Sequence, residues 1–472
     1  MNTTELQAAP VQEAFRDRVA TVDKDGKRVW VYPQKPKGAM HRKRVALTLL
    51  YLSALFGLPF VKVGGHPLFL FNVIDRKFIL FGQIFWPQDF FIFAVGMLLF
   101  IVFVALFTVV FGRVFCGWMC PQTIFMEMVF RKIEYWIEGD ANHQRLLDKA
   151  PWTAKKIAKK SAKWTAFWIV SFLIANTFLA YVIGIDELKK IITEPVSQHV
   201  GGFVALMLFT GVFFFVYLWF REQVCTAVCP YGRLQGVLLD KDSMVVAYDY
   251  KRGEQRGKFR KNTTREIGDC IDCMQCVKVC PTGIDIRNGT QLECVNCTAC
   301  IDACNHMMQA VGLEPNLIRL ASENSIQTGN PARFTTRTKA YTVVMALLLC
   351  VEVFLLTSRS EVSATVLRTS GQLYQEQEGG KLSNLYNYKF INKTYASKDV
   401  TLRPENFKGE IKLVGKQALA VPKEGDTSGE LFIVLPKSEV RRRKTDLKIG
   451  VYERGKKLQT VSTTFLGPFT AE

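Results

Sequence analysis

The sequence predicts a multi-domain membrane protein with five transmembrane α-helices, a cysteine-rich insert between the fourth and fifth of them, and a C-terminal all-β sandwich. Three observations predict this fold class. Five apolar runs are long enough to cross ~30 Å of hydrocarbon. Eight cysteines lie close together between Cys270 and Cys304. After residue 358, short alternating or β-branched runs are separated by Gly, Asn and Pro, which is typical of a β-sandwich of about a hundred residues.

The distribution of basic residues predicts how the chain is oriented in the membrane. Segments 64–88 and 186–201 hold two Lys or Arg each, whereas 112–164 holds ten and 221–339 holds sixteen. The positive-inside rule then places the N-terminus and the two basic segments in the cytoplasm. The tail holds twenty, but long domains cross largely regardless of charge. We therefore expect a multi-pass membrane protein whose C-terminal domain lies on the far side of the membrane from its N-terminus.

Composition agrees with a membrane location. The formal net charge of +19 could suggest a nucleic-acid partner, but the basic residues concentrate beside the long apolar runs, and the chain has 35 Phe. We expect a membrane partner and no nucleic acid. The expected domains are a loosely ordered cytoplasmic arm at 1–44, a membrane region at 45–220 with helices at about 45–63, 89–111, 165–185 and 202–220, a cytoplasmic domain at 221–339, a fifth helix at 340–357, and a periplasmic domain at 358–472.

Two connecting segments have distinctive patterns. The loop at 64–88 is apolar and aromatic but too broken by charge to span, so we expect it to pack along the outer membrane surface. Residues 150–164 carry Lys at helical spacing between two Trp. This pattern favours equally an interfacial helix that leads into the third span and a simple extension of that span with a solvated Lys face.

The cysteine-rich insert contains two copies of the motif C-x2-C-x2-C-x3-C. Each iron of a cubane [4Fe–4S] cluster needs a thiolate, and in two-cluster ferredoxins the fourth cysteine of each copy ligates the other cluster. A zinc site rarely uses this tight repeat, and a disulfide framework would need an oxidising compartment. We therefore expect a ferredoxin-like domain with two [4Fe–4S] clusters, cluster 1 on Cys270, Cys273, Cys276 and Cys304, and cluster 2 on Cys280, Cys294, Cys297 and Cys300.

Two further cysteine pairs follow the second and fourth apolar runs, in GRVFCGWMCPQ and REQVCTAVCPYG. The i,i+4 spacing would put both sulfurs of a pair on one face of a helix. Thiolates favour Cu(I), zinc or iron–sulfur species. Cysteine is also common at buried helix ends as a small apolar residue. Two matching pairs, each followed by Pro, favour a copper or redox site, whose candidate catalytic residues are Cys116, Cys120, Cys225 and Cys229, called here the membrane-edge cysteines.

Other chemistry-bearing residues give weaker signals. His66 and His199 lie in predicted outer loops, where a metal site and ordinary polar roles are both open. Met97 and Met207 suit packing inside spans, while Cys350 and Glu352 in the fifth span are assigned no role. The chain has no Gly-rich dinucleotide fingerprint after a strand and no P-loop. We therefore expect electrons to come from a separate, unidentified donor.

These motifs, together with the LFGQIFWPQDF loop, resemble the cytochrome c oxidase accessory protein family CcoG, also called FixG or RdxA, a group of membrane polyferredoxins. The resemblance covers essentially the whole chain, including the immunoglobulin-like (Ig-like) tail, and related features occur in the NapH and NosR maturation systems. It implies a role in assembling cbb-type cytochrome c oxidase, with oxidase subunits or copper-insertion factors as partners. The implied reaction is reduction of Cu(II) to Cu(I), with the two clusters relaying electrons to the membrane-edge cysteines.

Three functional hypotheses follow from these features. The first is a membrane-bound cupric reductase, because a [4Fe–4S] cluster delivers one electron at a time and thiolates stabilise Cu(I). The second is a general electron conduit between quinol or a cytoplasmic donor and a partner reductase. The third is a non-enzymatic assembly scaffold in which the β-domain docks oxidase subunits. Copper reduction by cluster-loaded protein separates the first hypothesis from the other two.

Overall fold

The structure is a computed structural model that describes residues 20–23, 25–73, 77–260, 267–330, 335–371, 373–415, 418–440 and 442–468. The chain divides into two compact units. Unit 1 comprises Met1–Phe60 and Met97–Leu348, and unit 2 comprises Val61–Gly96 and Leu349–Glu472.

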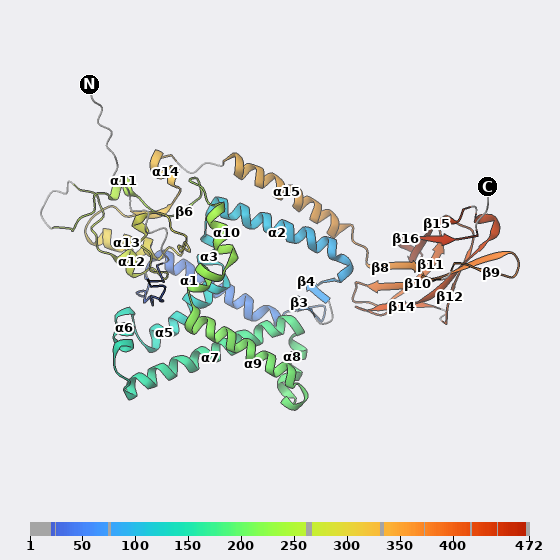
Figure 1. The fold of residues 1–472 in the computed structure, drawn as a ribbon, viewed down its shortest axis with the longest axis horizontal. Coiled ribbons are helices and arrows are strands. Elements are labelled where there is room, and N and C mark those ends of the chain that lie inside the picture. Colours follow the sequence, from blue (N-terminus) through green and yellow to red (C-terminus); the bar gives the residue numbers. More distant parts are fainter. Residues whose placement is uncertain are drawn as a thin grey trace, which may run out of the picture. The chain divides into compact units, whose positions relative to one another are not determined.

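Five helices among the described residues are long and apolar enough to cross a membrane (Figure 1). The predicted number of spans is therefore confirmed. The first and third begin earlier than the apolar runs suggest, because basic and polar residues continue each helix beyond the hydrocarbon-length stretch. The spans are Ala39–Phe60, containing α1 (Ala39–Gly57), Pro87–Phe111, containing α2 (Phe90–Phe111), α7 (Ala154–Ile183), Val200–Phe220, containing α9 (Val200–Phe215), and α15 (Thr336–Thr357).

The third span and residues 154–164 form one continuous helix, α7, which begins at the N-cap Thr153. The extension is therefore helical, as both interpretations expect, and two of its Lys side chains are paired with carboxylates rather than solvated. Lys160 Nζ lies 2.9 Å from a carboxylate oxygen of Glu138 and 2.6 Å from one of Asp148, and Lys163 Nζ lies 2.9 Å from Glu138. These acidic residues follow α5 (Arg131–Ile137) and lie on α6 (Ala141–Lys149). The solvated-face interpretation is therefore wrong for Lys160 and Lys163, which pair with Glu138 and Asp148, whereas Lys155 of the same segment is exposed.

The described part of the N-terminal arm packs against the rest of unit 1. The backbone N–H of Gln34 donates to the carbonyl of Lys278 at 2.8 Å, and the Tyr32 hydroxyl donates to Asp148. The Arg28 guanidinium pairs with Glu222 at 3.1 Å. The expectation of a loosely ordered arm is thus wrong for residues 25–38, where these polar partners hold the chain. Residues 1–19 lie outside the described part.

The cysteine-rich domain has little regular structure, and two short strands bring its ends together. Strand β6 (Val245–Tyr248) pairs antiparallel with β7 (Ile318–Ala321), so the chain enters and leaves the domain at one place. Between them lie α12 (Gln275–Lys278) and α13 (Ala299–Ala310), which pack against each other. The segment before β6 includes α10 (Pro230–Leu238). This arrangement folds the two cysteine motifs back towards each other.

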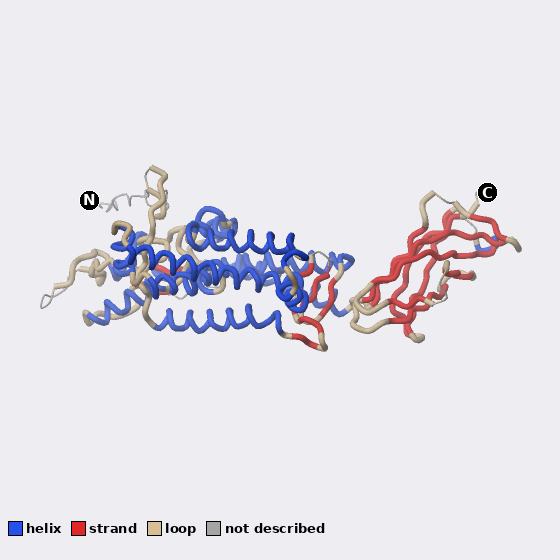
Figure 2. Tube along the Cα trace, turned by 90° about the horizontal axis from the view of Figure 1, so that it is seen from below, coloured by secondary structure: helices blue, strands red, loops and turns tan. Residues whose placement is uncertain are grey.

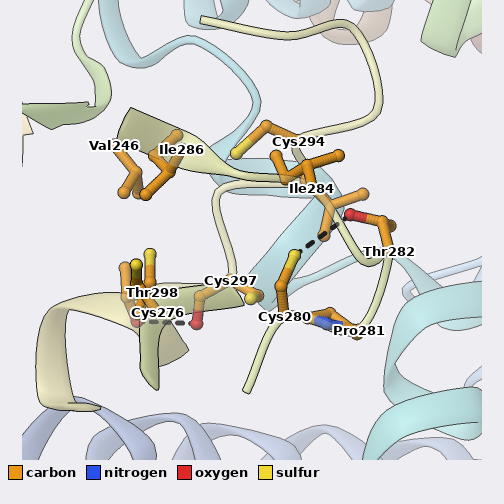
Figure 3. A pocket seen from close by; sticks show the side chains of 12 residues that line it. Val246, Cys276, Cys280, Pro281, Thr282, Ile284, Ile286, Cys294, Cys297 and Thr298 are labelled. Atoms are coloured by element: carbon orange, nitrogen blue, oxygen red, sulfur yellow. Dashed lines mark hydrogen bonds between the residues drawn. The ribbon is translucent and has the colours of Figure 1, made fainter. Parts of the chain in front are cut away.

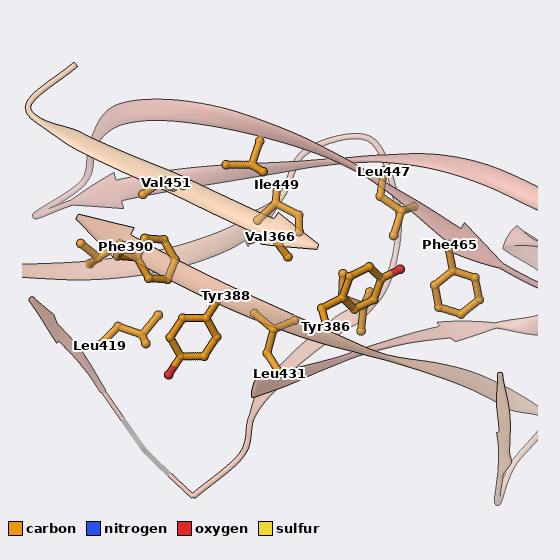
Figure 4. Packing of buried hydrophobic residues seen from close by; sticks show 14 of the residues in the cluster. Val366, Tyr386, Tyr388, Phe390, Leu419, Leu431, Leu447, Ile449, Val451 and Phe465 are labelled. Atoms are coloured by element: carbon orange, nitrogen blue, oxygen red, sulfur yellow. The ribbon is translucent and has the colours of Figure 1, made fainter. Parts of the chain in front are cut away.

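The C-terminal domain of unit 2 is a two-sheet sandwich, which confirms the predicted Ig-like fold (Figure 2). Alternating side chains from the two sheets fill its core, where Tyr386, Phe390, Leu431 and Phe465 are fully buried (Figure 4). One sheet has the order β12–β14–β10–β8, with β9 also paired to β10, and the other has the order β13–β11–β15–β16. The strands are β8 (Val362–Arg368), β9 (Gln375–Gln377), β10 (Lys381–Asn392), β11 (Lys398–Pro404), β12 (Glu410–Leu413), β13 (Leu419–Val421), β14 (Asp426–Pro436), β15 (Lys444–Glu453) and β16 (Lys456–Leu466).

The aromatic loop between the first two spans packs on the sandwich. It forms a three-stranded antiparallel sheet of β3 (Phe69–Asn72), β4 (Lys77–Leu80) and β5 (Gln83–Phe85). Its buried side chains Leu70, Ile79 and Ile84 contact Tyr395 of the sandwich. The Tyr395 hydroxyl donates to the carbonyl of Gly82 at 2.8 Å. The sandwich is therefore one packing partner of this loop, while Phe71, Val73 and Phe81 stay exposed, and packing along the membrane surface remains a prediction.

A buried ion cluster fixes the same junction. The Asp89 carboxylate accepts hydrogen bonds from Arg359 and Lys393, and all three side chains are at most 10% exposed. We expect Asp89→Ala to destabilise this junction by about 3–5 kcal/mol, because two buried cations lose their counter-charge. Limited proteolysis in detergent should show faster cleavage within residues 61–89. The control, Asp426→Ala, removes an exposed pair with Lys389 and should change little. Equal protease resistance of the two variants would contradict the role of Asp89.

Candidate iron–sulfur centres and the membrane-edge cysteines

The structure places one predicted set of four cysteines around a single pocket. Cys280, Cys294, Cys297 and Cys300 line it, together with apolar side chains that include Val246, Ile284 and Ile286 (Figure 3). The Thr282 hydroxyl lies 3.3 Å from the Cys280 sulfur. This cluster-2 pocket thus contains the full ligand set expected for cluster 2, including the cysteine contributed by the other motif.

The other predicted set lines a second pocket. Cys270, Cys273, Cys276 and Cys304 surround it, with Tyr248, Arg287 and Met307 among the other lining residues. Cys276 lines both pockets, so the two sites are neighbours. The structure therefore brings together each expected set of four thiols in this cluster-1 pocket and in the cluster-2 pocket, and iron ligation by these thiols stays a prediction.

The two motifs share an unusual local backbone, which explains how short loops aim three thiols at one centre. Asp272 and Met274 in the first motif have φ of 52° and 57°, and Asn296 and Thr298 at the equivalent positions of the second have φ of 52° and 64°. Left-handed residues reverse the chain direction, and they are rare outside Gly, Asn and Asp. The repeated pair of left-handed residues therefore wraps each C-x2-C-x2-C loop around its pocket.

The side chains of both pockets fit iron–sulfur clusters. Among the described residues, no three His, Cys, Asp or Glu side chains are placed to hold a single metal ion. Each pocket instead spaces four thiols around an apolar hollow, as a four-iron cluster requires. Burial raises the pKa of Cys276, and likewise that of Cys294 and Cys304, to about 12. Thiols in such surroundings become thiolates only when metal ions compensate the charge.

Each membrane-edge pair spans a break between two helical segments. Cys116 lies in α3 (Val114–Trp118), and Cys120 precedes α4 (Pro121–Thr123). In the second pair, Cys225 lies in the π-helical turn η7 (Val224–Val228), and Cys229 precedes α10. Cys120 and Cys229 have extended backbones, with ψ of 126° and 112°, because the residue before proline avoids the helical region. The expectation of two sulfurs on one helix face is therefore wrong.

The four membrane-edge cysteines nevertheless converge. Burial, together with the charges of Cys120, Cys116 and Cys229, raises the pKa of Cys225 to about 12. The Cys116 thiol donates to the Gln235 side-chain oxygen at 3.3 Å. These contacts define a shared electrostatic environment of four thiols. Their placement by α3, η7 and α10 fits a redox site better than four unrelated helix ends.

The cluster-2 pocket lies directly against the membrane-edge cysteines. A Cβ built on Gly117 would lie 2.5 Å from the carbonyl oxygen of Val295 and 2.9 Å from the Cα of Cys297. Gly117 therefore lets the α3 backbone touch the loop that carries Cys294 and Cys297. On the other side, Cys225 lines a small pocket together with Pro281 and Thr282, which follow Cys280. The spatial order is cluster-1 pocket, cluster-2 pocket, membrane-edge cysteines.

Two arginines that precede the cysteine pairs organise this region. The Arg221 guanidinium makes two hydrogen bonds to the Glu134 carboxylate, at 3.1 and 2.8 Å, in a buried pair. Arg113 donates to the Gln235 side-chain oxygen at 2.5 Å and to the carbonyl of Gly232 at 3.0 Å. Sequence reasoning assigned neither residue a role, although the matching Arg before each C-x3-C-P motif was a visible signal.

The remaining candidates take ordinary positions. His66 stacks on Tyr395 and lies 2.8 Å from Glu424, and His199 contacts Glu194. Cys350 is exposed on α15, and Met97 on α2 is exposed as well. Met207 is half-buried on α9. None of these residues lines the cluster pockets, and among the described residues neither His66 nor His199 belongs to a group of three or more His, Cys, Asp or Glu side chains that could hold a metal ion.

Three family models match the chain. A "4Fe-4S dicluster domain" matches residues 220–323, and a "4Fe-4S binding domain" matches 93–140. The third match, to the "IG-like fold at C-terminal of FixG, putative oxidoreductase", covers 353–468. The two iron–sulfur matches also include all four membrane-edge cysteines. Together with the five apolar helices, these matches define a membrane iron–sulfur electron-transfer protein.

Individual relatives show to which family of membrane iron–sulfur proteins the chain belongs. Protein RdxA of Cereibacter sphaeroides is 30% identical over 445 residues, which cover 90% of this chain and 94% of the relative. Nitrogen fixation protein FixG of Rhizobium meliloti is 30% identical over 460 residues, covering 87% of each chain. "Putative electron transport protein YccM" of Escherichia coli is 24% identical and covers 45% of this chain and 54% of its own. The chain belongs to the FixG family.

Proposed function

We propose that this protein carries electrons through cluster 1 and then cluster 2 to the membrane-edge cysteines, where Cu(II) is reduced to Cu(I) for assembly of cbb-type cytochrome c oxidase. The contact of Gly117 with the Val295–Cys297 backbone carries the proposal, because it joins the second cluster pocket to the first thiol pair. One electron leaves a reduced [4Fe–4S] cluster and one Cu(II) accepts it, so the step balances without another reactant.

The thiols suit the product of this step. Soft thiolate ligands favour Cu(I) over harder divalent ions, so they stabilise the reduced copper. Burial raises the pKa of the Cys116 and Cys225 thiols, and a bound copper ion would supply the positive charge that favours their deprotonation. Cu(II) is the substrate here, and the iron–sulfur clusters are the resident electron carriers.

The proposed location follows from charge and family. We place the protein in the bacterial inner membrane, with the N-terminus and cluster domain in the cytoplasm, because their flanking segments are rich in Lys and Arg. The sandwich then lies in the periplasm, where it would contact oxidase subunits or copper-insertion factors. Its packing against the loop at 64–88 gives the sandwich a fixed neighbour within its own unit, which suits a docking domain.

An anaerobic copper assay tests the proposal. Protein with dithionite-reduced clusters, freed of excess dithionite, should convert added Cu(II) to a Cu(I)–chelator complex, at about two Cu(I) per chain for two one-electron clusters. Cys225→Ser should abolish the fast phase while iron and sulfide contents stay unchanged. Copper reduction that persists in this variant would contradict the role of the thiols. Cluster-loaded wild-type protein that leaves Cu(II) unreduced would overturn cupric reduction and favour a conduit or scaffold.

A further inference from the structure

A polar cleft of about 940 Å³ lies beside the clusters in unit 1. The N-terminal arm and the start of α1 form one wall, and α12 and α13 form the opposite wall. Its volume falls within the range of about 300–1,000 Å³ that small-molecule sites occupy. The copper proposal makes no use of this cleft.

The cleft has an excess of basic side chains. Lys35, Lys37 and Arg42 line it, all three are exposed to solvent, and no ion pair joins them to another described residue. The two carboxylates in its lining are already engaged with backbone N–H groups. Asp302 accepts from Met40 at 3.1 Å and His41 at 2.7 Å, and Asp140 accepts from the Lys35 backbone at 2.9 Å.

A further cation lies near the cleft. Burial and the nearby charges of Lys35 and Arg44 hold the pKa of Lys132 below its usual range. An anionic group in the cleft would relieve this repulsion.

The cleft also shares a wall with the cluster-1 pocket. Met307 lines both. Two further lining residues, Gln275 and Asn305, are next in sequence to the cluster-1 ligands Cys276 and Cys304. A redox group in the cleft would therefore be separated from cluster 1 by a single layer of side chains.

From this charge, size and position we infer that the cleft binds a phosphate-bearing flavin mononucleotide, FMN, whose reduced form delivers electrons to cluster 1. Lys35, Lys37 and Arg42 would hold the phosphate, and the side-chain amides of Gln34, Gln275 and Gln309 suit the polar edge of the flavin ring. Reduced FMN loses two electrons and two protons to give oxidised FMN. Each of the two clusters takes one electron and the two protons pass to water, so the transfer balances. The inference rests on the proposed electron relay and adds its entry site.

Flavin binding is measured by quenching of flavin fluorescence with anaerobic, cluster-loaded, full-length protein. FMN should bind at least about tenfold more tightly than riboflavin, which lacks the phosphate, because one lost charge contact commonly costs that factor. Lys37→Glu should weaken FMN binding by about the same factor and leave riboflavin binding unchanged. The control variant, Lys258→Glu, changes an exposed lysine outside the cleft and should bind FMN normally. Equal affinities for FMN and riboflavin would overturn the inference.

Competing anions identify what occupies the cleft. Millimolar inorganic phosphate should compete with FMN, whereas transfer of the protein from zwitterionic to anionic lipid nanodiscs should leave FMN affinity unchanged. Loss of FMN binding in anionic nanodiscs would assign the cleft to lipid headgroups and overturn the inference.

Electron delivery is followed by the loss of cluster absorbance on mixing with photoreduced FMN. The wild-type rate should exceed that of Lys37→Glu by about tenfold at subsaturating FMN, because the rate there follows affinity. Dithionite should reduce both proteins equally, since it does not depend on the cleft. Two results together would overturn the flavin site and leave the copper function intact. Dithionite-reduced protein would still reduce Cu(II), and photoreduced FMN would reduce the clusters of wild-type protein and of Lys37→Glu at the same rate.

Discussion

Replacement of Cys300 by Ser is expected to remove cluster 2 and to reduce iron from about eight to about four atoms per chain, the difference of one [4Fe–4S] cluster. Cys300 lies on α13 and points its thiol into the cluster-2 pocket beside Cys294 and Cys297. A serine hydroxyl is a hard, poorly acidic ligand and does not replace a buried thiolate towards iron. Copper reduction should then fall to the background rate, because cluster 2 is the last carrier before the membrane-edge cysteines.

Iron and sulfide analysis of anaerobically purified protein measures this outcome, and EPR after reduction assigns the cluster that remains. Cluster 1 keeps all four of its thiols in the variant, so its EPR signal should persist. Cys350→Ser is the matched control, because Cys350 is an exposed cysteine on α15 outside both pockets. It should retain full iron content. A Cys300→Ser protein with wild-type iron and sulfide would contradict the assignment of Cys300 to cluster 2.

The grouping of the eight motif cysteines could be predicted from the sequence because it depends on local spacing. Three cysteines at C-x2-C-x2-C can only reach a shared centre when the chain curls between them, and Asp272, Met274, Asn296 and Thr298 adopt that curl. The five spans and the sandwich could be predicted for a similar reason. Each follows from a continuous pattern, either a long apolar run or period-two alternation over many residues.

Contacts between distant segments could not be predicted in this way. The loop at 64–88 reads as apolar and aromatic, but nothing in its own pattern shows that Tyr395 and the sandwich cover it. From their spacing alone, Lys160 and Lys163 are expected on a solvated helix face, because the sequence does not show that Glu138 and Asp148 lie next to them. The helix break at Cys120 and Cys229 was visible locally in the following prolines, yet the i,i+4 spacing was given more weight than the proline constraint.

The placement of cluster 2 against the membrane-edge cysteines is the long-range contact with the largest functional consequence. Gly117 lies between Cys116 and Cys120, and the backbone it touches is nearly 180 positions later in the sequence. Glycine at a helical position is unfavourable by about 1 kcal/mol relative to alanine, so its presence in α3 needs a packing reason. The absence of a Cβ supplies that reason.

Gly117→Ala is therefore expected to slow electron transfer from cluster 2 while both clusters remain bound. The new methyl group would overlap the Val295 carbonyl and the Cys297 Cα, so the cluster-2 loop and α3 must move apart. A displacement on the order of 1 Å at a reacting centre can cost up to about a hundredfold in rate, and we expect copper reduction to slow by about tenfold or more. Stopped-flow oxidation of reduced clusters by Cu(II) measures this rate directly.

Gly211→Ala provides the control, because a Cβ on Gly211 meets no atom within 4 Å and the residue lies on α9. This variant should match wild-type protein in rate. Iron content separates a distance effect from simple cluster loss, since Gly117→Ala should keep about eight iron atoms per chain. A normal rate with intact clusters would show that electrons do not cross the Gly117 contact, and the route through Pro281, Thr282 and Cys225 would then carry the transfer. The same experiment thus decides which of the two contacts between cluster 2 and the membrane-edge cysteines conducts.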